Sequence, residues 1–360
     1  MKKILTILGA RPQFIKAAAV SRAISKADEL QETLVHTGQH FDQNMSDIFF
    51  EEMAIPKPDY NLNINSLSHG AMTGQMLKGI EKIIQEKMPD IVLVYGDTNS
   101  TIAGALAAKK LNVKVGHVEA GLRSFNNKMP EEINRILTDR ISDLLFCPTD
   151  TAVKNLEKEG FVNYECKIVK NGDVMYDAAL FYSELSAEKS SIISDLKLTN
   201  EKFILCTIHR QENTDDLNCL NSIVRALNRI NKEIRIVFPM HPRTRKIIEK
   251  ENIQLDFEPI EPVGYFDIIE LLKNCSLVMT DSGGLQKEAY FFKNHCVTLR
   301  EQTEWIETVE CGFNIIAGSD EERIYKGYQK MLTKQSDFNV NLYGNGDASE
   351  VIVHQLIENL

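Results

Sequence analysis

Five apolar runs of this chain each end in polar residues whose types suit chemistry on a phosphorylated ligand. The residues that follow them include Arg11, Asp97, Glu119, His209 and Ser282. The runs resemble buried strands and cover Lys2–Leu8, Ile91–Tyr95, Val113–Val118, Phe203–Ile208 and Leu277–Thr280. Ligands of an open parallel sheet bind at the carboxyl ends of its strands. The pattern therefore predicts one shared site, and an enzyme.

The first of these loops, GARPQFIK from Gly9 to Lys16, is a candidate phosphate site. Glycine allows a sharp turn at the strand end, and the following helix directs free N–H groups at a ligand. Arg11 and Lys16 add positive charge that suits a diphosphate. The loop is neither a Walker A motif nor a GxGxxG fingerprint, so ATP and NAD find no support. A plain turn with two solvated cations is the alternative interpretation.

Three carboxylates are candidates for proton transfer. Asp97 and Glu119 follow wholly apolar strands, which predicts a position at the edge of the sheet rather than on a solvated face. Glu131 lies in the first turn of a helix that we expect to begin at Pro130. Carboxylates crowded into one site raise one another's pKa, which suits a proton shuttle near neutral pH. For Glu131 the alternatives are stabilisation by the helix dipole or a pair with Arg135.

A second set of candidates lies in the later half of the chain. His209 and Arg210 follow one strand-like run, and His241 follows another. Ser282–Gly284 combines a helix N-cap with a glycine turn, and Glu288 follows one helical turn later. These features favour a phosphate site with an acidic side chain for ribose hydroxyls. The alternatives are a structural histidine and a simple helix cap.

Composition excludes several classes of protein. The 360 residues are 43% hydrophobic and 26% charged, with a formal net charge of −10. No block of Lys and Arg appears, which argues against a nucleic-acid partner, and no apolar run approaches the roughly 18 residues of a membrane span. The seven cysteines are scattered without a CxxC pair. We therefore expect free thiols in a cytoplasmic protein, and no metal site.

Strand-like runs alternate with helical patterns along the whole chain, which predicts an α/β fold. After Pro130, for example, Ile133 and Leu137 recur at helical spacing. A second series of strands starts near Phe203 and includes Ile234–Phe238 and Cys296–Leu299. We expect two doubly wound Rossmann-like domains with a cleft between them. The predicted boundary follows residue 172, so that residues 1–172 form the first domain and 173–346 the second.

Nine motifs, in this order along the chain, resemble those of the non-hydrolysing UDP-N-acetylglucosamine 2-epimerase family. They are GARPQFIK, HTGQHFDQNM, VYGDTNST, HVEAGLRS, MPEEINR, GDVMYDA, IHRQEN, HPRTR and TDSGGLQKEA. The resemblance runs from Gly9 to about Gly346, where LYGNGDAS resembles the closing motif of the family. It implies the glycosyltransferase-B architecture, with a last helix at about 347–360 that returns to the first domain. It also implies a UDP-sugar substrate, no cofactor and no catalytic metal, and we expect a homodimer.

The resemblance also assigns roles to individual residues. It places Asp97, Glu119, Glu131 and His209 in the proton-transfer set. Arg11 and Lys16 would contact the diphosphate and complete the catalytic surroundings. The implied UDP-binding group is His241, Ser282, Gly283, Gly284 and Glu288, with Arg210 and Arg300 bordering the same cleft. We expect the C2 proton to be removed as UDP leaves C1, and re-addition of UDP with protonation from the opposite face to invert C2.

The sequence departs from the common family pattern at several positions. Ala10 and Gln13 replace two residues of the usual TRPE in the first loop, and Tyr95 replaces the histidine of HGDT. The common TERPE stretch has Trp305 in place of its arginine. Asp42 and His69 lie where regulated members bind a second, activating sugar nucleotide, yet neither matches that pattern. GARPQFIK, RSFNNKMPEEINR and QTEW resemble instead the branch that acts on UDP-2,3-diacetamido-2,3-dideoxy-glucuronic acid.

The branch resemblance favours this diacetamido uronate as the substrate, converted from the gluco to the manno configuration for a surface polysaccharide such as lipopolysaccharide. Its 6-carboxylate would need a cation, for which Arg123, Arg135 and Arg243 are candidates. The main alternative is conversion of UDP-N-acetylglucosamine to UDP-N-acetylmannosamine. A hydrolysing relative, a glycosyltransferase-B type transferase and a non-catalytic nucleotide-sugar sensor are further alternatives. The intact carboxylates argue against the last two.

Overall fold

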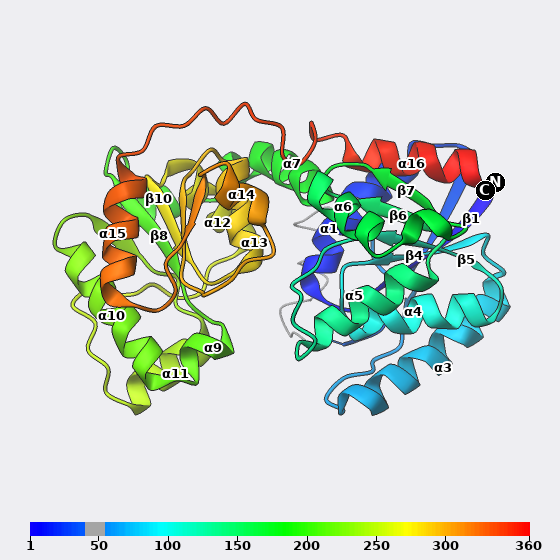
Figure 1. The fold of residues 1–360 in the computed structure, drawn as a ribbon, viewed down its shortest axis with the longest axis horizontal. Helices are drawn as coiled ribbons and strands as arrows, with labels where there is room; N and C mark the ends of the chain where they lie inside the picture. The colour runs from blue at the N-terminus through cyan, green and yellow to red at the C-terminus, as the bar shows by residue number, and fades with distance from the viewer. Residues whose placement is uncertain (40–54) are drawn as a thin grey trace. The chain divides into compact units, whose positions relative to one another are not determined.

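A computed structural model of the chain describes residues 1–39 and 55–360. The described residues form two compact units, drawn as ribbons in Figure 1. Unit 1 comprises Met1–Ala178 and Asn341–Leu360, and unit 2 comprises Ala179–Val340. Asp42, and with it most of the HTGQHFDQNM motif, lies outside the described residues, as does the side chain of Arg11.

Unit 1 is built on a parallel sheet of seven strands in the order β3-β2-β1-β4-β5-β6-β7. The strands are β1 (Lys2–Leu8), β2 (Leu30–His36), β3 (Tyr60–Asn61), β4 (Ile91–Tyr95), β5 (Lys114–Val118), β6 (Leu144–Cys147) and β7 (Lys167–Lys170). The chain progresses outward in one direction from β1 to β3 and in the other from β4 to β7. The order therefore reverses between β1 and β4, and ligands of doubly wound sheets bind at such a switch point.

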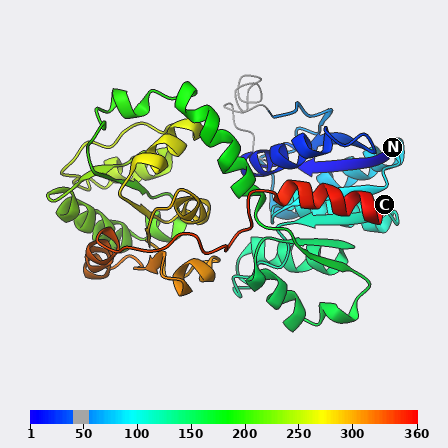
Figure 2. The ribbon, with the colours of Figure 1, turned by 90° about the horizontal axis from the view of Figure 1, so that it is seen from above.

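Helices cover both faces of this sheet because the central strands are buried on both sides. All five residues of β4 are buried, as expected for the middle of a parallel sheet. On one face α3 (His69–Lys87), α4 (Asn99–Lys110) and α5 (Pro130–Ile141) pack side by side, and on the other α1 (Arg11–Ile24) packs against α16 (Ala348–Asn359) (Figures 1 and 2). The remaining elements are α6 (Asp150–Lys158), the 3₁₀ turn η1 (Phe161–Asn163) and α7 (Val174–Lys189), which continues into unit 2.

Unit 2 repeats this plan with five parallel strands in the order β12-β11-β10-β8-β9. The strands are β8 (Phe203–Thr207), β9 (Arg235–Val237), β10 (Leu277–Thr280), β11 (Cys296–Thr298) and β12 (Asn314–Ile316). The helices are α8 (Ile192–Asp195), α9 (Gln211–Thr214), α10 (Leu217–Asn231), α11 (Pro242–Lys250), α12 (Tyr265–Asn274), α13 (Gly283–Phe291), α14 (Ile306–Glu310) and α15 (Glu321–Leu332). Here the strand order reverses between β8 and β10.

Alternation along β8 divides the apolar core of unit 2 into two layers. Ile204 and Cys206 belong to the layer that includes α10 and α15, whereas Phe203 and Leu205 belong to the layer that includes α12 and α13. Successive side chains of a strand point to opposite faces, so this strand contributes to both layers. The sheet is therefore held rigidly from both sides, and the loops at its carboxyl edge start from fixed positions.

The last residues of the chain complete unit 1 rather than unit 2. The carboxylate of Asp177 accepts hydrogen bonds from the backbone N–H of Ala348, at 3.2 Å, and of Ser349, at 2.7 Å, at the start of α16. At the other end of the helix, Lys2 Nζ donates to the carbonyl of Leu360. The two chain ends consequently lie side by side (Figure 1).

The expected fold class, two doubly wound α/β units, is confirmed, and each strand named from the sequence is present with its ends shifted by at most one residue.

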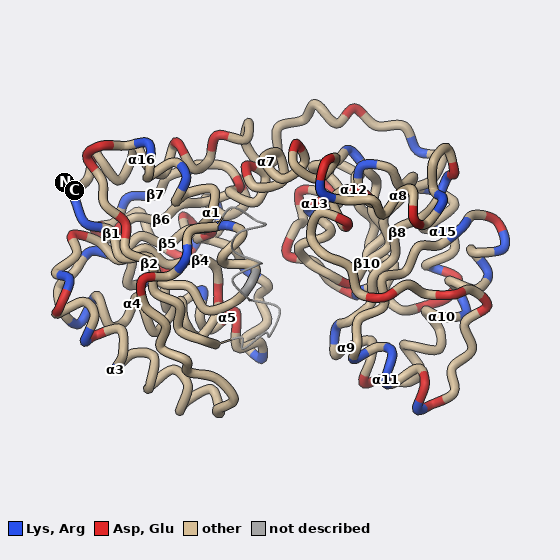
Figure 3. Tube along the Cα trace, turned by 180° about the vertical axis from the view of Figure 1, so that it is seen from behind, with Lys and Arg blue, Asp and Glu red and all other residues tan. Residues whose placement is uncertain are grey.

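Lys, Arg, Asp and Glu are intermingled over the described parts of both units (Figure 3). Within the described residues no helix is long and apolar enough to cross a membrane.

Candidate active site

The predicted site residues of unit 1 gather at the switch point of its sheet. The loop after β1 carries Gly9–Arg11, and the loop after β4 carries Gly96 and Asp97. Because β1 and β4 are neighbours, these loops meet at the carboxyl edge of the sheet (Figure 1). The loop after β5 adds Glu119 to the same edge.

Asp97 is held by a cation from α5. Its Oδ2 lies 2.6 Å from Nη2 of Arg135, and 27% of the Asp97 side chain is exposed. The same guanidinium contacts Glu132 at 2.9 Å. Asp97 therefore presents a charged, partly accessible carboxylate whose position depends on Arg135.

Glu119 forms a second ion pair in the same region. Its Oε1 lies 2.7 Å from Lys16 Nζ, and both side chains are largely buried. Glu119 has a φ of 75°, a left-handed conformation that costs a non-glycine residue about 1–2 kcal/mol. A Cβ at Gly96 would stand 3.7 Å from Glu119 Oε1 and 3.8 Å from Lys16 Nζ. Glycine at this position thus leaves open space beside the pair.

The two glutamates at the start of α5 differ in their surroundings. Glu131 is exposed in the first helical turn, where the helix dipole favours its charge. Glu132, which the sequence analysis did not single out, is buried and accepts hydrogen bonds from the backbone N–H of Ser124 and Phe125. Burial raises the pKa of Glu132, but these bonds and Arg135 outweigh it and lower the pKa below its usual value. Glu132 is a structural anion, and Glu131 is the accessible one.

Gln13 joins the first loop to the loop that carries Asp97. Its Oε1 accepts from the backbone N–H of Gly9 and Ala10, at 2.8 and 3.0 Å. Its Nε2 donates to the carbonyl of Tyr95 at 2.6 Å and to the Thr98 hydroxyl at 3.0 Å. A carboxylate at this position has no proton to donate to a carbonyl. Gln13, which replaces the glutamate of the usual TRPE, therefore donates a hydrogen bond that an ionised glutamate could not donate.

The predicted nucleotide residues of unit 2 gather at its own switch point, between β8 and β10. Asp281 is completely buried there and ties the two loops together. Its carboxylate accepts from the backbone N–H of His209, at 3.0 and 3.1 Å, and of Arg210, at 2.9 Å. Asn213 Nδ2 adds a further bond at 3.1 Å. Asp281 is thus the anchor of the site rather than an accessible ligand.

His209 is positioned over this anchor. Its Nδ1 lies 3.4 Å from Asp281 Oδ1, and 36% of its side chain is exposed. Burial lowers the pKa of His209; Asp281 opposes this shift, whereas Arg210, His241 and Arg300 reinforce it. The ring centroid of His241 lies 5.7 Å from that of His209. His209 is therefore a neutral, accessible imidazole near pH 7.

The start of α13 provides the predicted phosphate loop. Ser282 is its N-cap and accepts from the N–H of Leu285. Gly284 is exposed, whereas a Cβ at Gly283 would lie 3.4 Å from Glu304 Oε2. Free N–H groups at a helix N-terminus attract anions, so the loop has the geometry of a phosphate site.

Glu288 and Arg300 are both buried and both paired. Glu288 Oε1 accepts from the hydroxyl of Tyr265 at 2.9 Å, and burial together with Glu288 raises the pKa of Tyr265 well above its usual value. Both Nη atoms of Arg300 lie 3.3 Å from the carboxylate of Glu304. Burial raises the pKa of Glu304, but Arg300 and Arg210 outweigh it and lower the pKa.

Trp305, which replaces an arginine of the common pattern, closes one side of this loop. Its indole N–H donates to the carbonyl of Gly283 at 2.9 Å, and Lys287 Nζ lies 4.0 Å from the ring centroid. The side chain is 6% exposed. Trp305 therefore packs against the Gly283 loop and helps to fix its shape.

All three arginines suggested for a sugar carboxylate have acidic partners in the protein, and those of Arg135 are Asp97 and Glu132. Arg123 is buried, and its guanidinium contacts Asp139 at 2.7 Å and Glu159 at 2.6 Å. Arg123 is therefore a buried, paired guanidinium rather than a solvated one. Arg243 contacts Asp215 and the Thr214 hydroxyl. His69, considered for an activator site, lies 3.2 Å from the amide nitrogen of Asn99.

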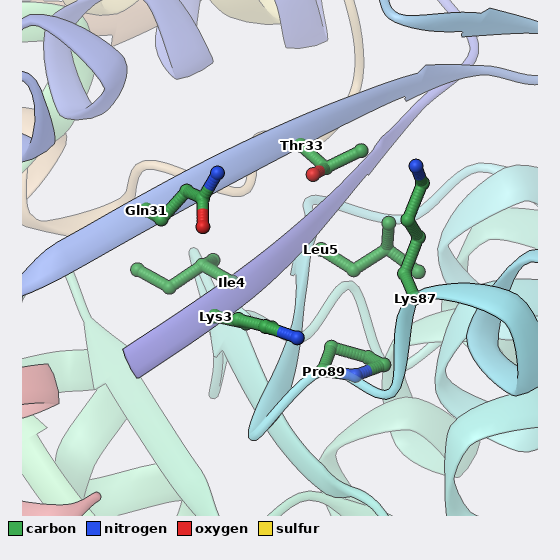
Figure 4. A pocket seen from close by; sticks show the side chains of 7 residues that line it. All are labelled: Lys3, Ile4, Leu5, Gln31, Thr33, Lys87 and Pro89. Atoms are coloured by element: carbon green, nitrogen blue, oxygen red, sulfur yellow. The ribbon is translucent and has the colours of Figure 1, made fainter. Parts of the chain in front are cut away.

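A hollow at the other end of the unit 1 sheet does not belong to this site. Figure 4 shows Lys3, Gln31 and Thr33 lining it, together with Lys87 from the end of α3. These residues lie at the amino ends of β1 and β2, whereas the candidate catalytic residues follow the carboxyl ends. Within the described residues, no group of three or more His, Cys, Asp or Glu side chains is arranged to hold a metal ion.

Comparison with known proteins gives the family. A family model described as UDP-N-acetylglucosamine 2-epimerase matches residues 22–357. The chain belongs to this family. The epimerase is 54% identical to the UDP-2,3-diacetamido-2,3-dideoxy-D-glucuronate 2-epimerase of Pseudomonas aeruginosa, over 98% of this chain and 99% of the relative. It is 48% identical to a UDP-N-acetylglucosamine 2-epimerase of Methanococcus maripaludis, over 98% of both chains.

A solved structure supports the same assignment. The UDP-GlcNAc 2-epimerase of Methanocaldococcus jannaschii, in complex with UDP-GlcNAc and UDP, superposes with a TM-score of 0.89 at 43% identity and covers 100% of both chains. The epimerase studied here therefore has the glycosyltransferase-B type of fold, with two Rossmann-like units, and belongs to a family of isomerases.

Proposed function

We propose that this epimerase inverts C2 of UDP-2,3-diacetamido-2,3-dideoxy-glucuronate, from the gluco to the manno configuration. The observation that carries this choice is the high identity to the Pseudomonas aeruginosa enzyme over nearly the full length of both chains. Trp305, a feature of the same branch, is buried against the Gly283 loop and supports the assignment.

The chemistry follows from the weak acidity of the C2 proton. A base removes this proton while the C1–O bond to UDP breaks, and the electron pair of the C–H bond becomes the C1=C2 double bond of a glycal. UDP leaves with the electron pair of the C1–O bond. Protonation of C2 from the opposite face and re-addition of UDP at C1 then give the epimer. No net redox change occurs, so no cofactor is required.

Unit 1 supplies the proton-transfer groups in this scheme. Asp97 and Glu119 are carboxylates at one sheet edge, each held by a cation at 2.6 to 2.7 Å. Glu131 is the accessible carboxylate of α5. General acid–base groups of this kind each contribute about 10²–10⁴-fold to rate. Lys16, placed against Glu119, and Arg11 supply positive charge for the departing diphosphate.

Unit 2 supplies the nucleotide site in this scheme. The N-terminus of α13, with Ser282, Gly283 and Gly284, binds phosphate oxygens, and Glu288 accepts hydrogen bonds from the ribose. The neutral imidazole of His209 donates a hydrogen bond to the phosphate as charge develops on it. Arg210, His241 and Arg300 complete the surroundings of the UDP.

The decisive experiment is turnover of the candidate sugars in D2O, followed by NMR. The scheme predicts deuterium at C2 of the product and slow leakage of UDP and glycal. Epimerised product that keeps its original C2 proton throughout would rule the scheme out. Net and complete release of UDP would instead indicate a hydrolysing enzyme.

A second substrate is favoured by one observation. The Methanococcus maripaludis relative carries the name of a UDP-N-acetylglucosamine 2-epimerase at nearly the same identity. Comparison of kcat/KM for the two sugars decides between them, because a site built to bind the 6-carboxylate discriminates strongly against the neutral sugar. Equal or faster turnover of UDP-N-acetylglucosamine would overturn the uronate assignment and leave the epimerase assignment intact.

We further propose that the enzyme acts as a cytoplasmic homodimer that supplies a surface polysaccharide pathway. Light scattering coupled to size exclusion tests the dimer directly. A mass of a single chain at micromolar concentration would refute it.

A further inference from the structure

The motif HVEAG contains a histidine that the proposed chemistry does not use. His117 lies on β5, two residues before Glu119, and is completely buried. Its Nε2 lies 2.7 Å from the carbonyl oxygen of Gly96, and its Nδ1 lies 2.6 Å from Oδ1 of Asp139. Gly96 directly precedes Asp97, so His117 connects the two loops that carry the candidate carboxylates.

The carbonyls of three consecutive residues around this turn each accept a side-chain donor from a different element. Gln13 of α1 donates to Tyr95 at 2.6 Å. His117 of β5 contacts the carbonyl of Gly96, and Asn134 of α5 donates to that of Asp97 at 2.9 Å. We call Gln13, His117 and Asn134 the carbonyl clamp. Because its members come from three elements, the clamp fixes the turn relative to the whole unit 1 sheet.

His117 has a buried partner at each ring nitrogen. A carbonyl oxygen can only accept, so the Nε2 position must carry a proton. His117 Nδ1 and Asp139 Oδ1 lie only 2.6 Å apart, and each would be an acceptor without a proton. A proton must therefore lie between these two atoms as well. The ring is therefore held at both nitrogens and cannot turn without breaking a buried bond.

Asp139 extends this arrangement to the segment after Glu119. Its Oδ2 accepts from the backbone N–H of Gly121 at 3.1 Å and lies 2.7 Å from Nη1 of Arg123. Glu159 in turn contacts Arg123 at 2.6 Å. The buried charges are thus compensated, and the bonds reach both sides of Glu119.

We propose that His117 is a positioning residue that holds the turn bearing Asp97 in register with Glu119, while Asp139 holds the His117 ring. This rests on the proposed proton-transfer roles of Asp97 and Glu119. Misplacement of a reacting group by about 1 Å costs on the order of 10²-fold in rate. A hydrogen bond to the carbonyl next to Asp97 controls displacements of this size.

Two substitutions separate the two contacts of the ring. His117→Asn places its amide near the former Nδ1, so it keeps a donor to Asp139 and loses the contact to Gly96. His117→Gln places its amide near the former Nε2, so it keeps the donor to Gly96 and loses Asp139. A positioning role predicts that H117N lowers kcat about 100-fold or more, while H117Q lowers it less than about tenfold.

We expect the two variants to rank in the opposite order for the thermal midpoint, Tm, than for kcat. H117Q leaves Asp139 without one of its partners and should have the lower Tm, whereas H117N keeps that partner and should have the higher Tm. KM for the UDP-sugar and Kd for UDP should stay within about twofold of wild type in both variants, because His117 contacts none of the residues proposed to bind the nucleotide. The rate of deuterium incorporation at C2 should fall in parallel with kcat.

The matched control is His295, a buried histidine of unit 2 whose Nε2 contacts Ser336 Oγ at 2.8 Å. His295→Asn loses this contact and should change Tm without changing kcat. If kcat follows Tm across the three variants, the role of His117 is only structural and the proposal is wrong. Should H117N fail to fold, a loss of more than 100-fold in kcat for folded H117Q refutes the proposal equally.

The failure of this inference can be distinguished from the failure of the proposed function. Asp97→Asn and Glu119→Gln measure the proton-transfer roles directly, with the same exchange experiment. If both variants lose exchange while H117N keeps it, the function stands and the positioning role is refuted. If both variants exchange at the wild-type rate, the proposed site itself is wrong.

Discussion

The switch points of the two units have the same topology but different electrostatics. In unit 1 the acids that follow the strands are held by side-chain cations, as Lys16 holds Glu119 and Arg135 holds Asp97. In unit 2 the acid of the strand end, Asp281, is completely buried and accepts backbone N–H groups of the neighbouring loop. The first arrangement presents charged groups that can exchange protons. The second fixes a loop and leaves a helix N-terminus for an anion. This difference is the basis for the proposed division between proton transfer in unit 1 and nucleotide binding in unit 2.

Glu119→Gln tests the chemical side of this comparison and should give the largest effect. The amide keeps the shape and removes the base, so kcat should fall by about 10²–10⁴-fold. UDP affinity, measured by calorimetry, should stay close to wild type because most of the proposed nucleotide residues lie in unit 2 and the amide can still accept a hydrogen bond from Lys16. A variant that loses UDP binding together with turnover would break the proposed division of labour.

His209 should have a smaller effect with a distinct pH dependence. His209→Gln should lower kcat by about 10²-fold if the imidazole stabilises the leaving phosphate. Because burial lowers the pKa of His209 below 6.5, the neutral ring predominates at pH 7. Protonation of the ring adds a positive charge beside the leaving phosphate, so kcat/KM should gain a component that rises as the pH falls through that lowered pKa, and this component should be absent from the profile of H209Q. An unchanged profile would remove His209 from the reaction.

The same shift gives a prediction for stability. The unfolded chain binds a proton at His209 near pH 6.5, whereas the folded chain does so only at lower pH. Between these values the unfolded state carries more protons, so falling pH destabilises the fold. Wild type should thus lose stability from pH 6.5 downward more steeply than H209Q in denaturant titrations. Parallel curves would contradict the burial argument.

Glu288→Ala tests the binding side and should leave the chemistry largely intact. The loss of a charged acceptor for ribose hydroxyls should weaken UDP by ~1–3 kcal/mol. The control is Tyr265→Phe, which removes only the hydroxyl that donates to Glu288 and should weaken UDP less. Unchanged calorimetric affinity of E288A would refute the ribose assignment.

Trp305→Phe should give the smallest effect. It removes one hydrogen bond to the Gly283 carbonyl and keeps most of the ring, so UDP binding should weaken by about 0.5–1.5 kcal/mol. The preference between the two candidate sugars should shift by less than about tenfold. A complete reversal of preference would show that Trp305 contacts the sugar directly.

The sequence predicted the strands and the residues at their ends because both are local properties. A wholly apolar run such as Ile91–Tyr95 must be buried, and the polar residue after it must reach the sheet edge. The partners of those residues were harder to predict, because they come from distant segments. Nothing in the spacing of Gln13 or Asn134 indicates that each donates to the turn before or at Asp97.

The helix α5 is a second example of what the sequence does not predict. Its start at Pro130 was predicted correctly. Its apolar residues Ile133 and Leu137 are nevertheless 47% and 49% exposed, while Glu132 and Asp139 are buried. Apolar periodicity identifies the helix, but here hydrogen bonds to loops and strands decide which face turns inward. Charged residues can occupy a core face when each finds a partner.

The return of α16 to unit 1 has a consequence for synthesis of the chain. Unit 2 is an insertion between Ala178 and Asn341, so a ribosome completes unit 2 before it makes the last helix of unit 1. Until then the face of α1 that α16 covers is exposed on the nascent protein. Unit 1 can therefore reach its final fold only after α16 has been made, and a chain truncated before residue 348 would carry a finished unit 2 attached to an unfinished unit 1.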